Sequence, residues 1–357
     1  MQITRVYGDT DFITGLRAIA ASMVVIIHKG AFDELGILGQ TVTSAGKYGV
    51  DIFFVISGFT IAKTFGEATS FRHYLFRRLM RIVPLYWMVL VVATLLWQSG
   101  QFTLPYWMQL YDVGPDFYNL IVHMTMLSYL DYRIANSLLG VEWSIPIEVF
   151  SYVVMPAVLF LGRTIPRTLL ALFGLLLLTA ILSHISKEIF GTSRPISWSP
   201  VASGHLFFVG VPAFYLRRKL EAVEGLKVIL WIAGALIMYA IAMALDFGGR
   251  DALIAVATAV LIIFVTPARA GWLTKVLTTR LMLFVGSVSY SLYLIHLLVA
   301  HILTDLQLLP PAGLITFGVV FCISVALSTL TYVLVERPTN ELGRRIVKKR
   351  EAARAPA

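Results

Sequence analysis

The sequence predicts an all-α polytopic integral membrane protein with about ten transmembrane helices and both termini in the cytoplasm. Three observations lead to this class: the composition, a series of long apolar segments, and an uneven distribution of basic residues along the chain. Hydrophobic residues make up 58% of the 357 residues and charged residues only 14%, whereas an average soluble domain has roughly 45–50% and about 25%. A soluble fold of this length cannot hide so much apolar surface, so the composition excludes a soluble globular enzyme.

The apolar segments have the length that a bilayer requires. A helix needs about 20 mainly apolar residues to cross the hydrocarbon core. The segments that satisfy this requirement are 13–32, 48–66, 82–99, 143–162, 168–186, 200–216, 227–245, 251–267, 281–303 and 313–335. Residues 117–130 are also apolar, but they are few and include Asn119 and His123. We expect this stretch to lie at the interface or to re-enter the membrane.

The basic residues give the orientation. With ten spans and a cytoplasmic N-terminus, 21 of the 29 Lys and Arg residues fall in inner segments and 6 in outer ones. This asymmetry follows the positive-inside rule. The formal net charge of +9 is therefore attributed to membrane orientation, and no nucleic-acid partner is expected.

The chain shows no composition shift that would divide it. We expect one transmembrane domain over residues 1–340 and a basic cytoplasmic tail over 341–357. The tail is predicted to lack a fixed structure and to contact anionic lipid headgroups. Cys322 is the only cysteine, which excludes an internal disulfide and a cysteine-based zinc site, and no HExxH motif is present, so no metal is expected.

Arginines near the inner ends of two spans are the first candidate site residues. An ionisable side chain in a span costs about 2.5–3.5 kcal/mol on insertion scales, so such residues are candidates for function. Arg17 lies about one turn into the first span, and Arg78 and Arg81 share a helix face at the start of the third. Guanidinium groups bind phosphate oxygens in pairs, so these three residues could hold a phosphorylated cytosolic compound. Arg77 is more simply explained as a topology anchor.

A second group, in the outer half, combines histidines and acids: His28, Asp51, Glu148, His205 and His296. His28 follows Arg17 by 11 residues, which places it on nearly the same helix face and about 16 Å further across the membrane. His205 and His296 could also be core histidines bonded to carbonyl groups, and Asp51 could be a helix cap. His28 and Glu148 are the stronger candidates for chemistry.

Seven sequence blocks at these positions resemble the membrane acyltransferase 3 family, in the family's order. They are GLRAIAASMVVIIH (15–28), GVDIFFVISGF (49–59), FRRLMRIVPLYW (76–87), WSIPIEVFSYVVMP (143–156), HLFFVG (205–210), SYSLYLIH (289–296) and VERP (335–338). The resemblance covers about residues 11–340. Two positions depart from the family's pattern, Thr14 in place of Asp and Pro146 in place of a small residue.

The resemblance implies a bacterial inner-membrane O-acyltransferase. Such enzymes take an acyl group, usually acetyl, from cytosolic acyl-CoA and transfer it to hydroxyls of exported glycans such as O-antigen or exopolysaccharide. Carried over residue by residue, Arg17 and His28 match the essential pair of the first span, Arg78 and Arg81 the Arg-x-x-Arg motif, and Glu148 the acid of the Trp-Ser block.

The chemistry of these residue types agrees with that implication. An alcohol is a poor nucleophile at neutral pH, and histidine is suited to deprotonate it. We expect Arg17, Arg78 and Arg81 to hold the phosphates of acetyl-CoA, and His28 to act as general base. Asp51 or Glu148 would fix the tautomer of His28. The residues expected on the acceptor side are Tyr290, Tyr293, His296 and His205.

Two alternatives remain at this point. The acceptor could be a small molecule such as a macrolide, or the protein could be a transporter or flippase of a lipid-linked glycan, because buried charges and interrupted helices also suit transport. The expected partners are acyl-CoA, a glycan or lipid-linked glycan acceptor, and membrane lipids. Residues 100–142, which are rich in Trp and Tyr, could form a lid or an acceptor platform, or an interfacial aromatic belt.

Overall fold

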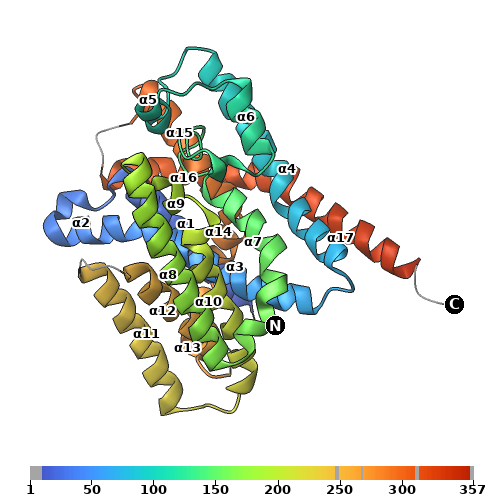
Figure 1. Ribbon diagram of the computed structural model, residues 1–357. Coiled ribbons are helices and arrows are strands. Elements are labelled where there is room, and N and C mark those ends of the chain that lie inside the picture. The colour runs from blue at the N-terminus through green and yellow to red at the C-terminus, as the bar shows by residue number, and fades with distance from the viewer. Residues whose placement is uncertain (1–9, 246–248, 267, 310–312, 354–357) are drawn as a thin grey trace, which may run out of the picture. The chain divides into compact units, whose positions relative to one another are not determined.

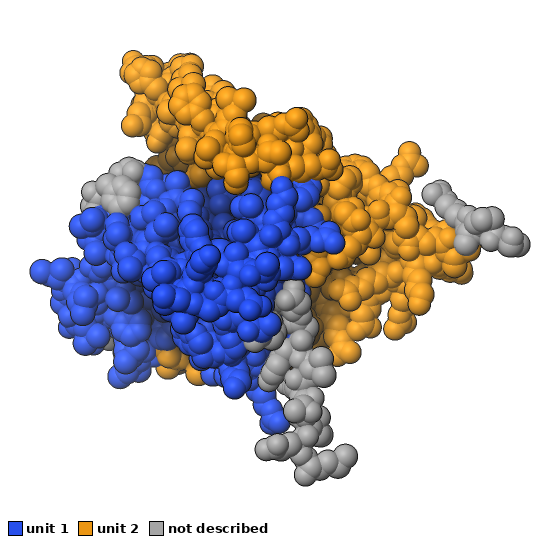
Figure 2. All heavy atoms as spheres, turned by 90° about the horizontal axis from the view of Figure 1, so that it is seen from below, with its two compact units in different colours: residues 1–59, 206–290, 312–317 blue, residues 60–205, 291–311, 318–357 orange. Residues whose placement is uncertain are grey.

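The computed structural model describes residues 10–245, 249–266, 268–309 and 313–353. Within these ranges the regular elements are helices and there is no strand (Figure 1). The chain divides into two compact units, coloured in Figure 2: unit 1 comprises residues 1–59, 206–290 and 312–317, and unit 2 comprises residues 60–205, 291–311 and 318–357. The predicted all-α fold is confirmed.

The helices have the following bounds. Unit 1 contains α1 (Asp11–Lys29), α2 (Gly36–Ser44), α11 (Leu226–Ala244), α12 (Arg250–Phe264), α13 (Gly271–Leu277) and α14 (Arg280–Ser287). Unit 2 contains α4 (Phe71–Gln98), α5 (Tyr106–Tyr111), α6 (Phe117–Met124), α7 (Ser144–Val158), α8 (Ile165–Phe190), α9 (Arg194–Ser197) and α17 (Arg337–Ala352). The helices that pass from one unit to the other are α3 (Tyr48–Gly66), α10 (Pro200–Lys219), α15 (Ser289–Asp305) and α16 (Leu314–Thr331).

The described residues contain eight helices that are long and apolar enough to cross a membrane, or nine if α14 and α15 form one broken span. This confirms a multi-pass membrane protein. The remaining predicted span, 251–267, corresponds to α12, which has 15 residues and is therefore only about 22 Å long. Its residues from Ala257 to Phe264 are all buried, as in a core helix that is too short for the usual span. The stretch 117–130 forms the short helix α6 of 8 residues.

Unit 1 is built around α1, which packs against α13, α14 and the short 3₁₀ turn Ala45–Lys47. Small residues make this packing close: Ala18, Ala20 and Ala21 are buried, and a Cβ placed on Gly286 of α14 would overlap the carbonyl oxygen of Thr14. Small side chains let helix backbones approach each other in a membrane. The helix that carries Arg17 and His28 is thereby held on several sides.

Helices α3 and α10 approach each other at two glycines in the same unit. A Cβ on Gly58 would overlap the carbonyl oxygen of Phe207, and a Cβ on Gly210 would overlap that of Val55. Next to this crossing, the rings of Phe54 and Phe207 stack with centroids 4.5 Å apart. The blocks VISGF and HLFFVG, which the sequence linked to the family, thus meet in one helix crossing.

Replacing Gly58 by alanine is expected to lower the free energy of unfolding by about 1–3 kcal/mol, because the added methyl group meets backbone that cannot rotate away. The measurement is the thermal midpoint of the purified full chain in detergent. Gly174→Ala is the matched control, since Gly174 lies in α8 with open space around its Cβ position and alanine favours the helix by roughly 0.5–1 kcal/mol. Equal midpoints for the two variants would contradict the close crossing.

Arg217, at the end of α10, has a structural role that the sequence did not indicate. Its side chain is buried, and Nη1 donates to the carbonyl oxygens of Ile262 and Val265 at the end of α12. The guanidinium also lies 5.2 Å from the centroid of the Phe12 ring. A cation that satisfies the last carbonyl groups of a helix stabilises that helix end. Arg217, one of the basic residues that the sequence places in the inner segments, therefore bonds within the interior of unit 1.

The predicted unstructured tail is mostly helical, so that prediction is wrong. Helix α17 continues to Ala352 and lies beside α4 within unit 2 (Figure 1). Gly343 packs on the Met80 side chain, Val347 is buried, and Glu351 accepts a hydrogen bond of 2.6 Å from the Thr69 hydroxyl. These contacts supply the burial that a free basic tail would lack. Residues 354–357 of the predicted tail lie outside the described residues.

Candidate functional site

Helix α1 places Arg17 and His28 on one continuous element of unit 1. The helix runs from Asp11 to Lys29, and the left-handed backbone of Gly30 (φ 55°) caps it. Arg17 is half-buried with its guanidinium 5.9 Å from the Phe53 ring centroid. Because the helix is unbroken, the predicted separation of about 16 Å along its axis holds.

The His28 ring is oriented by a main-chain carbonyl. Its Nδ1 lies 2.7 Å from the carbonyl oxygen of Val24, one turn earlier. A carbonyl can only accept, so Nδ1 carries a proton and Nε2 is the basic nitrogen of the neutral ring. The ring is half-buried. This arrangement provides the tautomer that a general base needs. The sequence predicts that Asp51 or Glu148 fixes this tautomer; in the structure the Val24 carbonyl oxygen contacts the ring.

The other unit 1 candidates lie at helix ends. Asp51 is in the first turn of α3, the position in which a carboxylate also favours the helix dipole. Tyr290 is in the first turn of α15 and is buried. Both assignments stay predictions.

In unit 2, Arg78 is a buried residue of α4 and not a surface anchor. Its side chain is only 6% exposed. Nη2 donates to the carbonyl oxygen of Thr60 at 2.6 Å and to the hydroxyl of Thr64 at 2.7 Å. Both acceptors belong to the end of α3, so Arg78 joins α3 to α4 within unit 2.

Tyr152 connects Arg78 to Glu148. The Arg78 guanidinium carbon lies 5.2 Å from the Tyr152 ring centroid, within the range of a cation–π contact. The Tyr152 hydroxyl donates to Glu148 Oε1 at 2.6 Å. The charges of Glu148, Arg78 and Arg81 all act on the phenol of Tyr152. We call Arg78, Arg81, Glu148 and Tyr152 the arginine–glutamate network.

This network corrects the division of the candidates into an inner cationic group and an outer group that included Glu148. The structure brings Arg78 and Glu148 together through one side chain. The loop before α7 is buried from Ile134 to Leu139, so α7 begins in the interior of unit 2. Glu148, about one turn into α7, therefore lies half-buried within this unit. Tyr152 itself was missed, although its position four residues after Glu148 puts both on one helix face.

In the acyl transfer that the sequence resemblance implies, replacing Tyr152 by phenylalanine is expected to lower kcat about tenfold, because Glu148 loses a short charge-assisted hydrogen bond while the ring under Arg78 is kept. The measurement is CoA release from acetyl-CoA by the purified full chain. Tyr332→Phe is the control, since Tyr332 lies in the turn that joins α16 and α17. Unchanged kcat in the Tyr152 variant would separate Glu148 from the chemistry.

The remaining predicted residues of unit 2 are buried and bonded to main-chain carbonyls. The Tyr293 hydroxyl donates to the carbonyl oxygen of Val141 at 2.7 Å and lies 2.8 Å from the Ser144 hydroxyl. Nδ1 of His296 is 2.8 Å from the carbonyl oxygen of Tyr293, and Nδ1 of His205 is 2.8 Å from that of Ala202. The carbonyl-bonded alternative is thus present for both histidines, and their place on the acceptor side stays a prediction.

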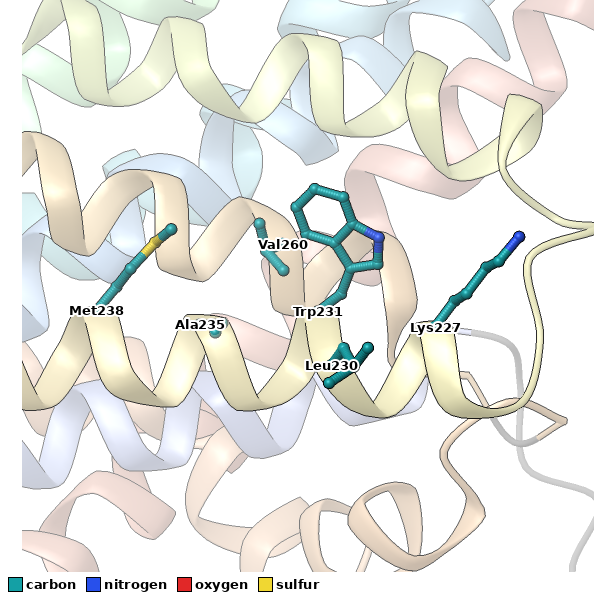
Figure 3. A pocket seen from close by; sticks show the side chains of 7 residues that line it. Lys227, Leu230, Trp231, Ala235, Met238 and Val260 are labelled. Carbon is teal, nitrogen blue, oxygen red and sulfur yellow. The ribbon is translucent and has the colours of Figure 1, made fainter.

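An open pocket of about 380 Å³ lies over α11 in unit 1 (Figure 3). Its lining is apolar apart from Lys227 at one end, with Trp231, Met238 and Val260 among the other side chains. None of the predicted site residues lines it, and the residues that do include no histidine or acid. The chemistry is therefore not assigned to this pocket.

Comparison with known proteins identifies a family. The model of an acyltransferase domain family, acyltransferase 3, matches residues 10–333. A Bacillus subtilis protein named "Putative peptidoglycan O-acetyltransferase YrhL" is 25% identical over 95% of this chain and 56% of its own length. A Staphylococcus aureus (strain COL) protein named a "Putative O-acetyltransferase" is 24% identical over 93% of this chain and 57% of its own length. The chain thus spans a little over half the length of these relatives.

No solved structure matches the chain. The family match covers nearly all of it, including every block that holds Arg17, His28, Arg78, Arg81 and Glu148. The multi-pass helical fold and this match together lead to one assignment: the chain belongs to the acyltransferase 3 family of membrane acyltransferases.

Proposed function

We propose that this protein transfers an acyl group, acetyl above all, from cytosolic acyl-CoA to a hydroxyl of an exported or cell-surface glycan in the bacterial inner membrane. The observation that carries the proposal is the bond between His28 Nδ1 and the Val24 carbonyl, which prepares Nε2 to accept a proton. O-acetylation is supported by the printed names of the two relatives, one of which specifies peptidoglycan.

In the proposed reaction, His28 Nε2 takes the proton of the acceptor hydroxyl as its oxygen attacks the thioester carbonyl. A carbon–oxygen bond forms and the carbonyl oxygen becomes an oxyanion. When this intermediate collapses, the carbon–sulfur bond breaks, the ester remains on the acceptor, and the CoA sulfur leaves with the proton held by His28. The step therefore consumes no other reactant.

The arginines have two tasks in this proposal. Arg17 and Arg81, both only half-buried, bind phosphate oxygens of the donor. Arg78 is buried by its contacts with Thr60, Thr64 and Tyr152, so it sets the electrostatic potential of the network and holds Tyr152 and Glu148 in place. Glu148, which accepts the Tyr152 hydrogen bond, supplies the negative charge of the network within unit 2, and Asp51 is proposed as a further polar side chain of unit 1 at the start of α3.

Deletion of the gene in its host tests the acceptor class. Mass spectrometry of the cell-surface glycans is expected to show loss of an acetyl substituent, restored by the wild-type chain and not by a His28→Ala chain. Full acetylation of every surface glycan in the deletion strain would contradict the proposal. A lost acetyl group on a secreted small molecule, with unchanged glycans, would move the acceptor to that class.

A further inference from the structure

The loop of residues 137–143, which leads into α7, is a buried polar junction outside the membrane-spanning helices. The side chains of Ser137, Leu138 and Glu142 are 0% exposed. Three elements of unit 2 bind its main chain or side chains: Trp97 of α4 donates to the carbonyl oxygen of Leu138 at 2.9 Å, Asn119 of α6 donates to Ser137 Oγ at 2.9 Å, and Tyr293 of α15 donates to Val141.

Glu142 is the centre of this junction. Its Oε1 accepts the N–H of Leu138 at 2.6 Å, and its Oε2 accepts the N–H of Val141 at 3.0 Å. Its own carbonyl oxygen accepts the N–H of Ile145 at 3.0 Å, which is the first turn of α7. The side chain of Glu142 therefore closes the loop. Its main-chain carbonyl accepts the first hydrogen bond of α7, the helix that carries Glu148.

His123 faces this carboxyl group from α6. Its Nε2 lies 3.6 Å from Glu142 Oε1, and neither side chain is exposed to solvent. Its Nδ1 lies 2.8 Å from the carbonyl oxygen of Asn119 and so carries a proton. The basic nitrogen of the neutral ring is thus the one that faces Glu142.

Burial has opposite effects on the two groups. It raises the pKa of Glu142 from 4.5 to about 7 and lowers the pKa of His123 from 6.5 to about 4. The charge of Glu142 in turn acts on two buried phenols that face it, Tyr86 on α4 and Tyr293 on α15. Below about pH 7 the junction therefore holds a carboxylic acid beside a neutral imidazole, and above it a buried carboxylate.

We propose that Glu142 and His123 are positioning residues for acyl transfer, which fix the first turn of α7 and through it Glu148 and Tyr152 of the arginine–glutamate network. The role rests on the proposed function, because it acts through Glu148. Neither side chain of the pair is exposed to solvent, so the proposed role acts through α7. Loss of the Glu142 proton places a buried charge in the junction that main-chain N–H groups offset only in part, and this loosens the start of α7.

The test uses the purified full chain in detergent with acetyl-CoA as probe. Glu142→Gln keeps the shape of the side chain but can accept only one of the two N–H groups. Since small misplacements of reacting groups cost up to about a hundredfold in rate, we expect kcat to fall about ten- to a hundredfold with KM for acetyl-CoA changed less than twofold. The wild-type kcat should fall as the pH rises through 7, and the variant should lose this dependence.

Two further variants keep the proposal testable if Glu142→Gln does not fold. His123→Asn retains a donor to the Asn119 carbonyl and removes only the group facing Glu142, so a smaller fall in kcat, about threefold to tenfold, is expected at the same KM. Ser128→Ala is the control. Ser128 lies five residues after His123, and its buried hydroxyl has no hydrogen-bond partner among the described residues. It should leave kcat unchanged.

Thermal midpoints supply a readout with a defined sign. The pKa of Glu142 is raised in the folded chain, so its stabilising contribution is complete below about pH 4.5 and is lost as the pH rises through about 7. The midpoint of Glu142→Gln relative to wild type should therefore rise between pH 5 and pH 8. The contribution of His123 to stability is lost as the pH falls from about 6.5 through 4. It is present in both the wild type and Glu142→Gln, so it cancels in their difference.

Unchanged kcat and an unchanged pH profile in Glu142→Gln, with Glu148→Gln inactive, would overturn the positioning role and leave the proposed function intact. Full activity in both variants would instead remove Glu148 from the mechanism. A fall in the amount of folded protein, with kcat per folded molecule unchanged, would also overturn the proposal, since the junction would then be only structural.

Discussion

Replacing His28 by alanine is expected to lower kcat for acetyl transfer by 10²–10⁴-fold, the usual contribution of a general base. The imidazole is oriented by the Val24 carbonyl, and alanine provides no group that could take the hydroxyl proton. The measurement is steady-state release of CoA from acetyl-CoA by the purified full chain. Cys322, the single cysteine, adds a constant background to thiol detection.

The matched control is His184→Ala, since His184 is an exposed histidine of α8. It should retain wild-type kcat. Both variants should keep the wild-type thermal midpoint, because the His28 side chain is only half-buried. Near-normal transfer by the His28 variant would show that another group acts as the base.

Replacing Arg78 by alanine is expected to have the second largest effect, on both stability and rate. The buried guanidinium bonds to Thr60 and Thr64 and packs on Tyr152. A hydrogen bond to a charged group contributes about 1.5–3 kcal/mol, so the free energy of unfolding should fall by about 2 kcal/mol or more. Glu148 then also loses its nearby positive charge, and kcat should fall at least tenfold.

Two neighbouring variants on α4 provide the comparison. Arg81→Ala should raise KM for acetyl-CoA about tenfold with little change in kcat, because one arginine–phosphate contact is lost. Arg77→Ala should change neither, since Arg77 acts electrostatically on Glu351 of α17. Equal effects of all three substitutions would mean that the arginines only orient the helix in the membrane.

Much of the fold could be predicted because transmembrane helices are encoded by continuous apolar runs. The predicted spans at 13–32, 143–162 and 168–186 correspond to α1, α7 and α8. The prediction was less accurate where tertiary contacts decide. Helix α12 is short and buried, and α17 is ordered by packing of Gly343 and Val347. Neither outcome is visible in hydropathy alone.

The sequence predicts several residues of the candidate site but not the side chains that link them to one another. Arg78 and Glu148 were selected because charge in a span is costly, but Tyr152, which joins them, is an ordinary tyrosine in an apolar helix. Glu142 and His123 were not singled out, since the burial of a loop cannot be read from a segment outside the spans. Long-range packing places these groups together.

Transfer of radiolabel from acetyl-CoA to a glycan distinguishes acyl transfer from glycan transport. Membranes that contain the full chain would be incubated with labelled acetyl-CoA and host cell-surface glycan, and the purified glycan would be counted before and after mild alkali. We expect alkali-labile label with the wild-type chain and about a hundredfold less with His28→Ala. Glycan that crosses the membrane without acquiring label, equally in both chains, would contradict acyl transfer and favour transport.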